Sequence, residues 1–278
     1  MKKGIILINA FSGIGEHQAQ RLNEEFRKLG VDVPIVKNMP SNIPTGIDFC
    51  VFLDKDIYTA RALENRGVRL FNGSSAIEVC DDKMLTYIAL DGIVNQPKTL
   101  PSIFSYLPAK ATDEELDYII EQLELPLILK INKQSRGEGV FLIESKKRLK
   151  EMIENFRTTS HLYQKYISFA RGIDTRVIVI GSKVVASMLR VNQKDYRSNI
   201  ELGGVGQKTT ISKDMEEIAI KVSKTLNLDY CGIDFLTDED GVNYVCEVNS
   251  NAFFKGIECY GEVNVAKHYC QHILDSIS

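Results

Sequence analysis

The first third of the chain alternates short apolar runs with segments of helical periodicity, and this alternation restricts the fold more than any other feature. The predicted elements are strands at residues 5–9, 33–36, 49–53 and 68–71 and helices at residues 16–29 and 59–65. Strands that are joined by helices lie parallel in one sheet, with the helices packed on its faces. We therefore predict an N-terminal doubly wound, parallel α/β lobe.

The connection after the first strand, residues 11–16, carries Gly13 and Gly15 and looks like part of a dinucleotide-binding fingerprint. That fingerprint needs a third glycine, and an acidic residue beyond the second strand. The chain lacks the glycine, and no acidic residue clearly ends the second strand. We interpret residues 11–16 as a tight strand-to-helix turn.

The remaining two thirds of the chain show a different pattern, in which predicted strands often follow one another directly. Helices are predicted at residues 76–90, 113–123, 146–155, 213–226 and 263–277, and strands at residues 126–131, 140–144, 162–166, 175–180, 183–191, 230–236 and within 242–251. The Pro-containing segment 96–101 is interpreted as a linker. A chain of 278 residues suits two or three lobes rather than one core.

Composition excludes several classes of partner. The 34 Lys and Arg against 37 Asp and Glu give a net charge of −3, so we expect no nucleic-acid partner. No apolar run is long enough to cross a membrane, and the run at residues 4–8 is too short for a secretion signal. The six cysteines form no close pair, which indicates reduced core residues of a cytoplasmic protein.

Oxygen-bearing side chains mark the predicted strands near the C-terminus. Asp234 lies in one strand, and Glu247 and Asn249 lie two residues apart in the next. Side chains at i and i+2 leave a strand on the same face. Three hard oxygen ligands on one hairpin suit Mg²⁺ that is also held by nucleotide phosphates. The alternative is an acidic hairpin that faces solvent.

A lysine and a glycine-rich loop lie together in the middle of the chain. Lys130 sits inside the apolar strand 126–131, where an unpaired cation is unfavourable. It is followed by a loop whose Gly137 and Gly139 have backbone N–H groups that are able to cover phosphates. The spacing is not that of a Walker loop. An ordinary hairpin turn remains the alternative for this loop.

Three arginines form a second cluster of candidate residues. Arg176 begins one predicted strand, Arg190 ends the next, and Arg197 follows shortly afterwards. Guanidinium groups on adjacent strands can clamp a phosphoryl group and neutralise charge in its transition state. The alternative is that they are solvated residues at a sheet edge.

The ordered set of motifs resembles the ATP-grasp superfamily, and within it the RimK-type carboxylate–amine ligase family. The motifs that carry the resemblance are Asp82-Lys83, Lys130 with its glycine loop, Gln164 to Ile167, Asp174-Thr175-Arg176, Asp195 to Ile200 with Gly203-Gly204, Asp234, and Glu247-Val248-Asn249. The resemblance covers essentially the whole chain. It implies an ATP-grasp fold, two α+β lobes that clamp ATP, after the N-terminal α/β lobe.

The resemblance also implies domain bounds and roles for single residues. The expected domains are an N-terminal α/β domain at 1–75, a central or lid subdomain at 76–163, and a C-terminal subdomain with the metal site at 164–278. The implied nucleotide-binding residues are Lys83, Lys130, Gly137, Gly139, Lys165, Tyr166, Asp174, Arg197, Ser198 and Asn199. The implied metal ligands are Asp234, Glu247 and Asn249, and the implied catalytic residues are Lys130, Arg190 and Arg197.

Three departures from the family pattern affect what can be transferred. Lys165 stands where the hinge usually carries Glu, and Gln134 replaces the first glycine of the lid. Residues 252–256 replace the usual small residue and Pro-Gly after the metal ligands. Asn251, Lys255 and the strand ends near Asn9 and 54–56 are expected to line the acceptor side. The identity of the substrates is not transferred.

The function implied by the resemblance is an ADP-forming ligase that uses ATP and Mg²⁺, with Mn²⁺ as the alternative metal, to join a carboxylate to an amine. The expected reaction adds an amino acid such as glutamate to a peptide, a carrier protein or a metabolite, and the family's usual assembly is a homo-oligomer. The first alternative is a D-alanine–D-alanine or glutathione-type ligase. The second is a non-catalytic ATP-binding regulatory protein.

Overall fold

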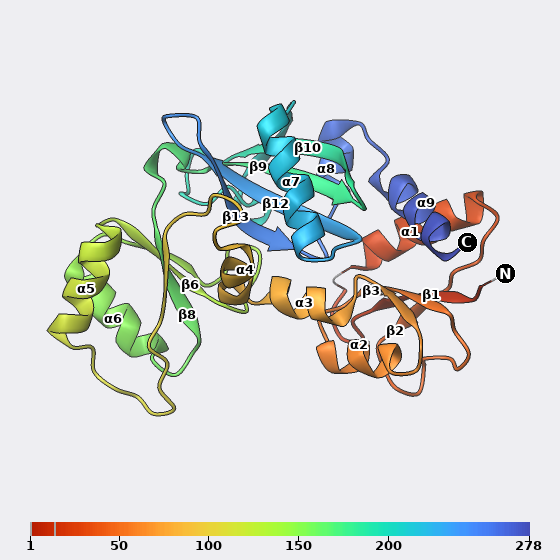
Figure 1. Ribbon diagram of the computed structural model, residues 1–278, viewed down its shortest axis with the longest axis horizontal. Helices are drawn as coiled ribbons and strands as arrows, with labels where there is room; N and C mark the ends of the chain where they lie inside the picture. The colour runs from red at the N-terminus through yellow and green to blue at the C-terminus, as the bar shows by residue number, and fades with distance from the viewer. Residues whose placement is uncertain (1, 14) are drawn as a thin grey trace.

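The structure is a computed structural model that describes residues 2–13 and 15–278. Within these residues it contains three separate β-sheets. In Figure 1 the N-terminal sheet lies at the right, a sheet that contains β6 and β8 lies at the left, and a larger sheet lies between them. Both ends of the chain lie on the N-terminal side. No helix of the described residues is long and apolar enough to span a membrane.

The N-terminal sheet is parallel, as the sequence predicts. Its strands are β1 (Gly4–Ile8), β2 (Ile35–Lys37), β3 (Phe49–Leu53) and β4 (Arg69–Phe71), in the order β2-β1-β3-β4, and its first helices are α1 (Glu16–Lys28) and α2 (Ile57–Glu64). Every residue of β1 and β3 is buried, because helices cover both faces of the sheet. The turn predicted at 11–16 includes Ile14, which lies outside the described residues.

The prediction of a single helix at 76–90 is wrong. The structure has two helices, α3 (Ser74–Asp81) and α4 (Lys83–Leu90), which are separated at Asp82. Asp82 has extended backbone angles, and its carboxylate accepts hydrogen bonds from the backbone N–H groups of Met84 and Leu85. It is therefore the N-cap of a new helix, and it fixes the position of Lys83 as the first residue of α4.

The second sheet is antiparallel and carries its helices on one face. Its strands are β5 (Thr99–Pro101), β8 (His161–Lys165), β6 (Leu127–Ile131) and β7 (Val140–Ile143), in that spatial order, and its helices are α5 (Asp113–Leu123) and α6 (Lys146–Phe156). The interpretation of 96–101 as a linker is wrong in part, because β5 pairs with β8. The glycine loop connects β6 to β7.

The third sheet has the spatial order β11-β10-β9-β12-β13. Its strands are β9 (Ile173–Ile180), β10 (Lys183–Val191), β11 (Val205–Lys208), β12 (Tyr230–Thr237) and β13 (Asn243–Asn249). One face packs against α7 (Lys213–Thr225) through residues such as Val177, Ile233 and Phe235. The other face carries Asp174, Arg176, Arg190 and Asp234, so it presents charge to the middle of the molecule. The sequence did not predict β11.

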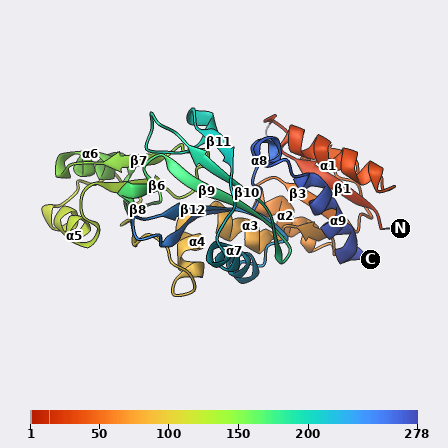
Figure 2. The ribbon, with the colours of Figure 1, turned by 90° about the horizontal axis from the view of Figure 1, so that it is seen from above.

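The chain returns to the N-terminal lobe through α8 (Lys255–Gly261) and α9 (Val265–Ile277). The helix predicted at 263–277 corresponds to α9, whereas α8 was not predicted. Leu22 and Phe26 of α1 share a core with Ile273 of α9. Figure 2 shows α8 beside β10 and next to α1. The bounds of the three domains stay a prediction.

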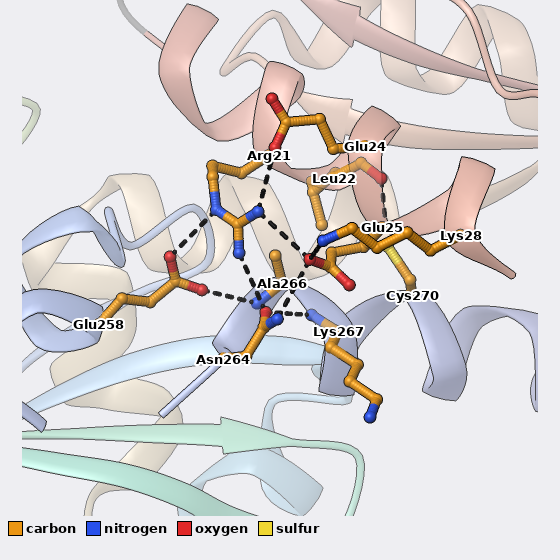
Figure 3. Close-up of polar contacts among 10 residues, drawn as sticks. All are labelled: Arg21, Leu22, Glu24, Glu25, Lys28, Glu258, Asn264, Ala266, Lys267 and Cys270. Atoms are coloured by element: carbon orange, nitrogen blue, oxygen red, sulfur yellow. Dashed lines mark hydrogen bonds and ion pairs between the residues drawn. The ribbon is translucent and has the colours of Figure 1, made fainter. Parts of the chain in front are cut away.

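A polar network ties these helices together (Figure 3). Arg21 of α1 donates to Glu258 of α8 at 3.4 Å and to Asn264, the N-cap of α9, at 3.1 Å. Glu258 also accepts from the backbone N–H of Ala266 at 3.0 Å. Arg21 therefore fixes α8 relative to α1.

Candidate active site

A cavity lies between the second and third sheets, and we call it the cleft cavity. Its apolar lining comes from Ile128, Val140, Ile167, Ala170, Ile173 and Leu236. Charged side chains such as Lys130, Asp174 and Glu247 complete its wall. Such a mixture of an apolar lining and a few convergent charged groups is typical of a small-molecule site.

Almost all of the residues that the sequence analysis singled out meet in this cavity. Those that line it are Lys83, Lys130, Gly137, Lys165, Tyr166, Asp174, Arg190, Arg197, Ser198, Asn199, Asp234 and Glu247. Gly139 lies in the adjoining loop and Asn249 lines a neighbouring cavity instead. The roles assigned to these residues stay predictions.

Two lysines, Lys130 which is buried and Lys83 which is largely covered, give the cleft cavity a positive end. Lys130 of β6 is 7% exposed, and its Nζ lies 3.4 Å from Cys246 Sγ. Among the described residues, it has no ion pair with a carboxylate. Lys83 donates to the carbonyl of Gln134, and its Nζ lies 3.9 Å from Glu247 Oε1. Burial lowers the pKa of Lys83, and the nearby Lys130 acts in the same direction.

The glycine loop between β6 and β7 is held against the third sheet. Gly137 and Gly139 have φ angles of +78° and +67°, which L side chains rarely adopt. The guanidinium of Arg197 donates to the carbonyl of Gly137 at 2.8 Å, and Tyr196 donates to the carbonyl of Val140 at 2.7 Å. Arg197 also forms a fork with Asp195. The loop is therefore closed over the cavity by residues 195–199.

The hinge between the two sheets places Lys165 and Tyr166 on the cleft cavity. The backbone N–H of Lys165 donates to the carbonyl of Lys98 at 2.8 Å, and its Nζ lies 3.6 Å from Glu124 Oε2. The hydroxyl of Tyr166 is buried without a hydrogen-bond partner among the described residues. The Lys165 side chain is thus directed to Glu124, and its backbone N–H is already used by Lys98.

Strand register assembles four charged side chains into one buried group. Arg190 lies opposite Asp174, and Arg176 lies opposite Asp234, so all four leave the sheet on the same face. Arg190 forms a fork with Asp174 and a further contact of 2.9 Å with Asp234. Arg176 forms a fork with Asp234 at 2.7 and 2.6 Å. These two arginines are therefore not solvated residues at a sheet edge.

The two guanidinium groups decide the ionisation of Asp234. Burial by itself opposes the charged carboxylate, but Arg176 and Arg190 outweigh it and lower the pKa of Asp234 to about 2. Asp234 is therefore an anion over the whole physiological range of pH. It is available to a cation only in competition with its arginines.

The predicted metal ligands lie next to one another on this face. Glu247 is directly opposite Asp234, and Asn249 lies two residues further along β13. A β-bulge at Cys246 follows the pair, as is common beside active sites. The amide nitrogen of Asn249 is buried without a partner among the described residues. Rotating the amide places an oxygen there instead.

These donors fit a hard divalent cation. The described residues contain no group of three or more His, Cys, Asp or Glu that forms a complete metal site. The set here is two carboxylates and one amide, which leaves positions open for oxygens of a bound phosphate. Mg²⁺ is usually bound in this manner, through one or two carboxylates together with substrate phosphates.

Two larger cavities adjoin the charged face on the side of the N-terminal lobe. The strand-end cavity, of about 500 Å³, is lined by Asn9, Asp54, Asn249 and Asn251 among others. The helix cavity, of about 700 Å³, lies between the start of α1 and α8. The residues that line both are Arg136, Arg176, Arg190, Glu201 and Phe253. Lys255 lines the helix cavity, and Lys55 lines the strand-end cavity.

Sequence reasoning missed three features of this region. It did not pair Arg176 with Asp234, place Cys246 beside Lys130, or place Arg136 over the Phe253 ring at 5.4 Å. The spacing of Asp174 and Arg176 already puts both on one face of a strand, which was the available signal for the first. The other two depend on a bulge and on a loop conformation.

Known proteins are similar to this chain in sequence. Residues 105–273 match the model of the RimK-like ATP-grasp domain. Beta-citrylglutamate synthase B of Homo sapiens is 38% identical, over 77% of this chain and 55% of that protein. N-acetylaspartylglutamate synthase A of Homo sapiens is 35% identical, over 87% of this chain and 59% of that protein. The chain thus spans little more than half the length of these two relatives.

A solved structure shows the same fold over the full length of the chain. The RimK domain protein ATP-grasp from Sphaerobacter thermophilus matches with a TM-score of 0.74 at 16% identity, covering 97% of this chain and 98% of that chain. The chain belongs to the RimK-like ATP-grasp family. The predicted family and fold class are confirmed.

Proposed function

We propose that this chain is an ADP-forming ligase that binds Mg-ATP in the cleft cavity and joins a carboxylate to an amine. The observation that carries the proposal is the pair of lysines, the largely covered Lys83 and the buried Lys130, on the same cavity as Asp234 and Glu247. A buried cation such as Lys130 needs an anionic partner, and a triphosphate supplies it. The neighbouring carboxylates suit the magnesium that accompanies a triphosphate.

The relatives support this reaction class. Both human proteins have names that describe the synthesis of a glutamate conjugate. For this chain we propose the addition of an amino acid, with glutamate first among the candidates, to a small-molecule or peptide carboxylate. A carrier-protein substrate, a homo-oligomeric assembly, Mn²⁺ as the metal and a cytoplasmic location are the finer parts of the proposal.

The residues of the cleft have distinct roles in the proposed reaction. The substrate carboxylate attacks the terminal phosphoryl group, ADP leaves, and the resulting acyl phosphate is attacked by the amine, which loses a proton as phosphate departs. Lys83, Lys130 and Arg190 neutralise charge on the transferring group. Mg²⁺, when bound by Asp234, Glu247 and Asn249, supplies further charge neutralisation at the phosphate oxygens. No protein nucleophile is needed.

Water must be kept from the acyl phosphate. The glycine loop at 135–139 covers the cavity, and its contacts to Tyr196 and Arg197 hold it closed. In this proposal the N–H groups of Gly137 and Gly139 meet the phosphates, and the positive φ angles of both residues suit glycine in such a loop. Opening and closing of this loop admits ATP and then isolates the reaction.

The experiment that tests the proposal is ADP formation from Mg-ATP across a panel of carboxylates and amino acids, given singly and in pairs. The proposal expects ADP only when a matching pair is present, together with an equal amount of amide product. Dipeptide formation from D-alanine alone would favour the D-alanine ligase alternative. ATP binding without acceptor-dependent ADP formation would favour the regulatory alternative.

A further inference from the structure

The ion pair between Arg176 and Asp234 crosses the wall that separates the cleft cavity from the other two cavities. Asp234 lines the cleft cavity, whereas Arg176 lines the strand-end and helix cavities. Arg190 lines all three. One side chain of the pair therefore faces the proposed nucleotide and metal, and the other faces the space left for the remaining substrates.

The two arginines differ in how their charges are compensated. Arg190 has its own fork with Asp174 and only one contact with Asp234. Arg176 is 14% exposed, and within the described residues its only ion-pair partner is Asp234. A cation that engages Asp234 thus leaves Arg190 paired but takes charge compensation away from Arg176. A buried guanidinium without an anion is strongly unfavourable.

On the side of the helix cavity, the surroundings of Arg176 favour an incoming anion as the replacement partner. The helix cavity also presents Arg136 and Lys255, and the acidic side chain that lines it is Glu201. Within the described residues Arg136 has no ion pair, and it makes a cation–π contact with the Phe253 ring. The planar guanidinium of Arg176 already forms a two-point fork with a carboxylate, and the same geometry suits a substrate carboxylate.

We propose that Arg176 is the residue that binds the substrate carboxylate, and that the metal-bearing nucleotide makes it available by drawing Asp234 away from it. This inference rests on the proposed function and adds to it a coupling between the two binding events. Metal–nucleotide and carboxylate then bind with positive coupling, and each must strengthen the other by the same factor.

The test measures Mn²⁺ binding at saturating ADP by electron paramagnetic resonance, with and without citrate or N-acetylaspartate as the carboxylate probe. In the wild type, at least one probe should tighten Mn²⁺ binding about tenfold or more. In Arg176→Met, Mn²⁺ should bind more tightly without a probe, and the probe should have no further effect. In Asp234→Asn, the probe should bind without metal, as measured by calorimetry.

Arg148→Met is the matched control, because it removes an arginine charge that is paired with one carboxylate, Glu151, at an exposed position that lines none of the three cavities. It should leave Mn²⁺ affinity in the absence of a probe unchanged. Arg176→Lys, which keeps the charge but loses the fork, guards against misfolding of the methionine variant and should weaken the coupling. Circular dichroism and thermal unfolding establish that each variant is folded.

Independent binding of Mn²⁺ and both probes in the wild type overturns the inference, and so does an Arg176→Met protein whose Mn²⁺ affinity still responds to a probe. Failure of the proposed function looks different. In that case Mn²⁺ and ADP do not bind to the wild type at all, or no carboxylate and amine pair supports ADP formation.

Discussion

Asp234 and Glu247 lie directly opposite each other on β12 and β13, yet their carboxylates have different partners. Asp234 is buried and held by two guanidinium groups, whereas Glu247 is 29% exposed and, among the described residues, forms an ion pair only with Lys83 Nζ, 3.9 Å away. The two residues at the same level of one hairpin are therefore not equivalent. Glu247 is the carboxylate that is readily available to a metal, and Asp234 is the one that must exchange partners.

Replacing Glu247 by Ala should abolish turnover with little effect on stability. The lost carboxylate weakens metal binding, while a partly exposed side chain with one distant ion pair contributes about 0.5 kcal/mol or less to folding. Steady-state kinetics at increasing Mg²⁺ and chemical denaturation measure the two effects. Glu239→Ala, at an exposed position of the same hairpin, is the control and should keep full activity. Normal turnover of Glu247→Ala at ordinary Mg²⁺ would sink its assignment as a ligand.

Lys83 should impose a pH limit on ATP use. Burial lowers its pKa below the ordinary value of 10.5, so it loses its charge at a lower pH than a solvated lysine. Below that pKa the charged amine is available to a phosphate, and kcat/KM for ATP should fall as the pH rises through it. The effect on stability has the opposite sign. Because the unfolded chain keeps the Lys83 proton to a higher pH than the folded protein, the free energy of unfolding increases over the same rise in pH.

Lys83→Arg separates charge from the rest of the side chain, because arginine keeps its proton throughout the accessible range. The variant should retain ATP binding and lose the alkaline decline in kcat/KM. The measurement is a pH profile of kcat/KM for ATP in both proteins. An identical alkaline limb in wild type and variant would show that a different group titrates.

The glycine loop should not tolerate a side chain at Gly139. Its φ angle is +67°, and an added Cβ would collide with the Gln134 side chain, which belongs to the same loop. Gly139→Ala should therefore raise KM for ATP about tenfold or more while the melting temperature changes little, since the loop adds little to the core. Gly46→Ala is the control, because Gly46 also has positive φ but has open space around it. Equal effects of the two substitutions on KM would contradict the role given to the loop.

Arg21 should influence acceptor binding from a distance. It fixes α8 to α1 through Glu258 and Asn264, and α8 carries Lys255 and Tyr260 into the helix cavity. Arg21→Met should lower the free energy of unfolding by about 1–3 kcal/mol, because it removes hydrogen bonds to a charged group. It should raise KM for the acceptor substrate and leave KM for ATP unchanged.

Arg27→Met is the matched substitution on the same helix, since the Arg27 side chain is exposed and its contact with Asp32 is 3.9 Å. Denaturation curves and separate KM values for the two substrates distinguish the variants. A rise in KM for ATP in Arg21→Met would show that α8 does not act on the acceptor site alone. Equal loss of stability in both variants would show that the contacts of Arg21 add no specific stability.

The sequence predicts the strand and helix order well where one face of an element is strongly apolar. The predicted bounds of β3, α5 and β10 agree with those of the structure. Prediction fails where a single side chain changes the chain direction, as Asp82 does between α3 and α4. It also fails for β11, a strand of four residues that includes Gly206 and has little apolar pattern.

The motifs locate the residues of the site but not their mutual contacts. The glycine loop, Lys130 and the hairpin with Asp234 and Glu247 were all identified from residue type and spacing. Whether Asp234 meets Arg176 depends on the register between β9 and β12, which are more than fifty residues apart in the chain. Register over that distance is set by packing of both sheet faces, so the order of residues alone does not determine it.

The most direct test of the central claim follows oxygen atoms from the carboxylate substrate to the released phosphate. The carboxylate that supports ADP formation is labelled with ¹⁸O, and the phosphate is analysed by mass spectrometry. An acyl-phosphate mechanism predicts one ¹⁸O atom in each phosphate, together with ADP and the amide. Unlabelled phosphate, or AMP in place of ADP, would contradict the proposed ligase mechanism.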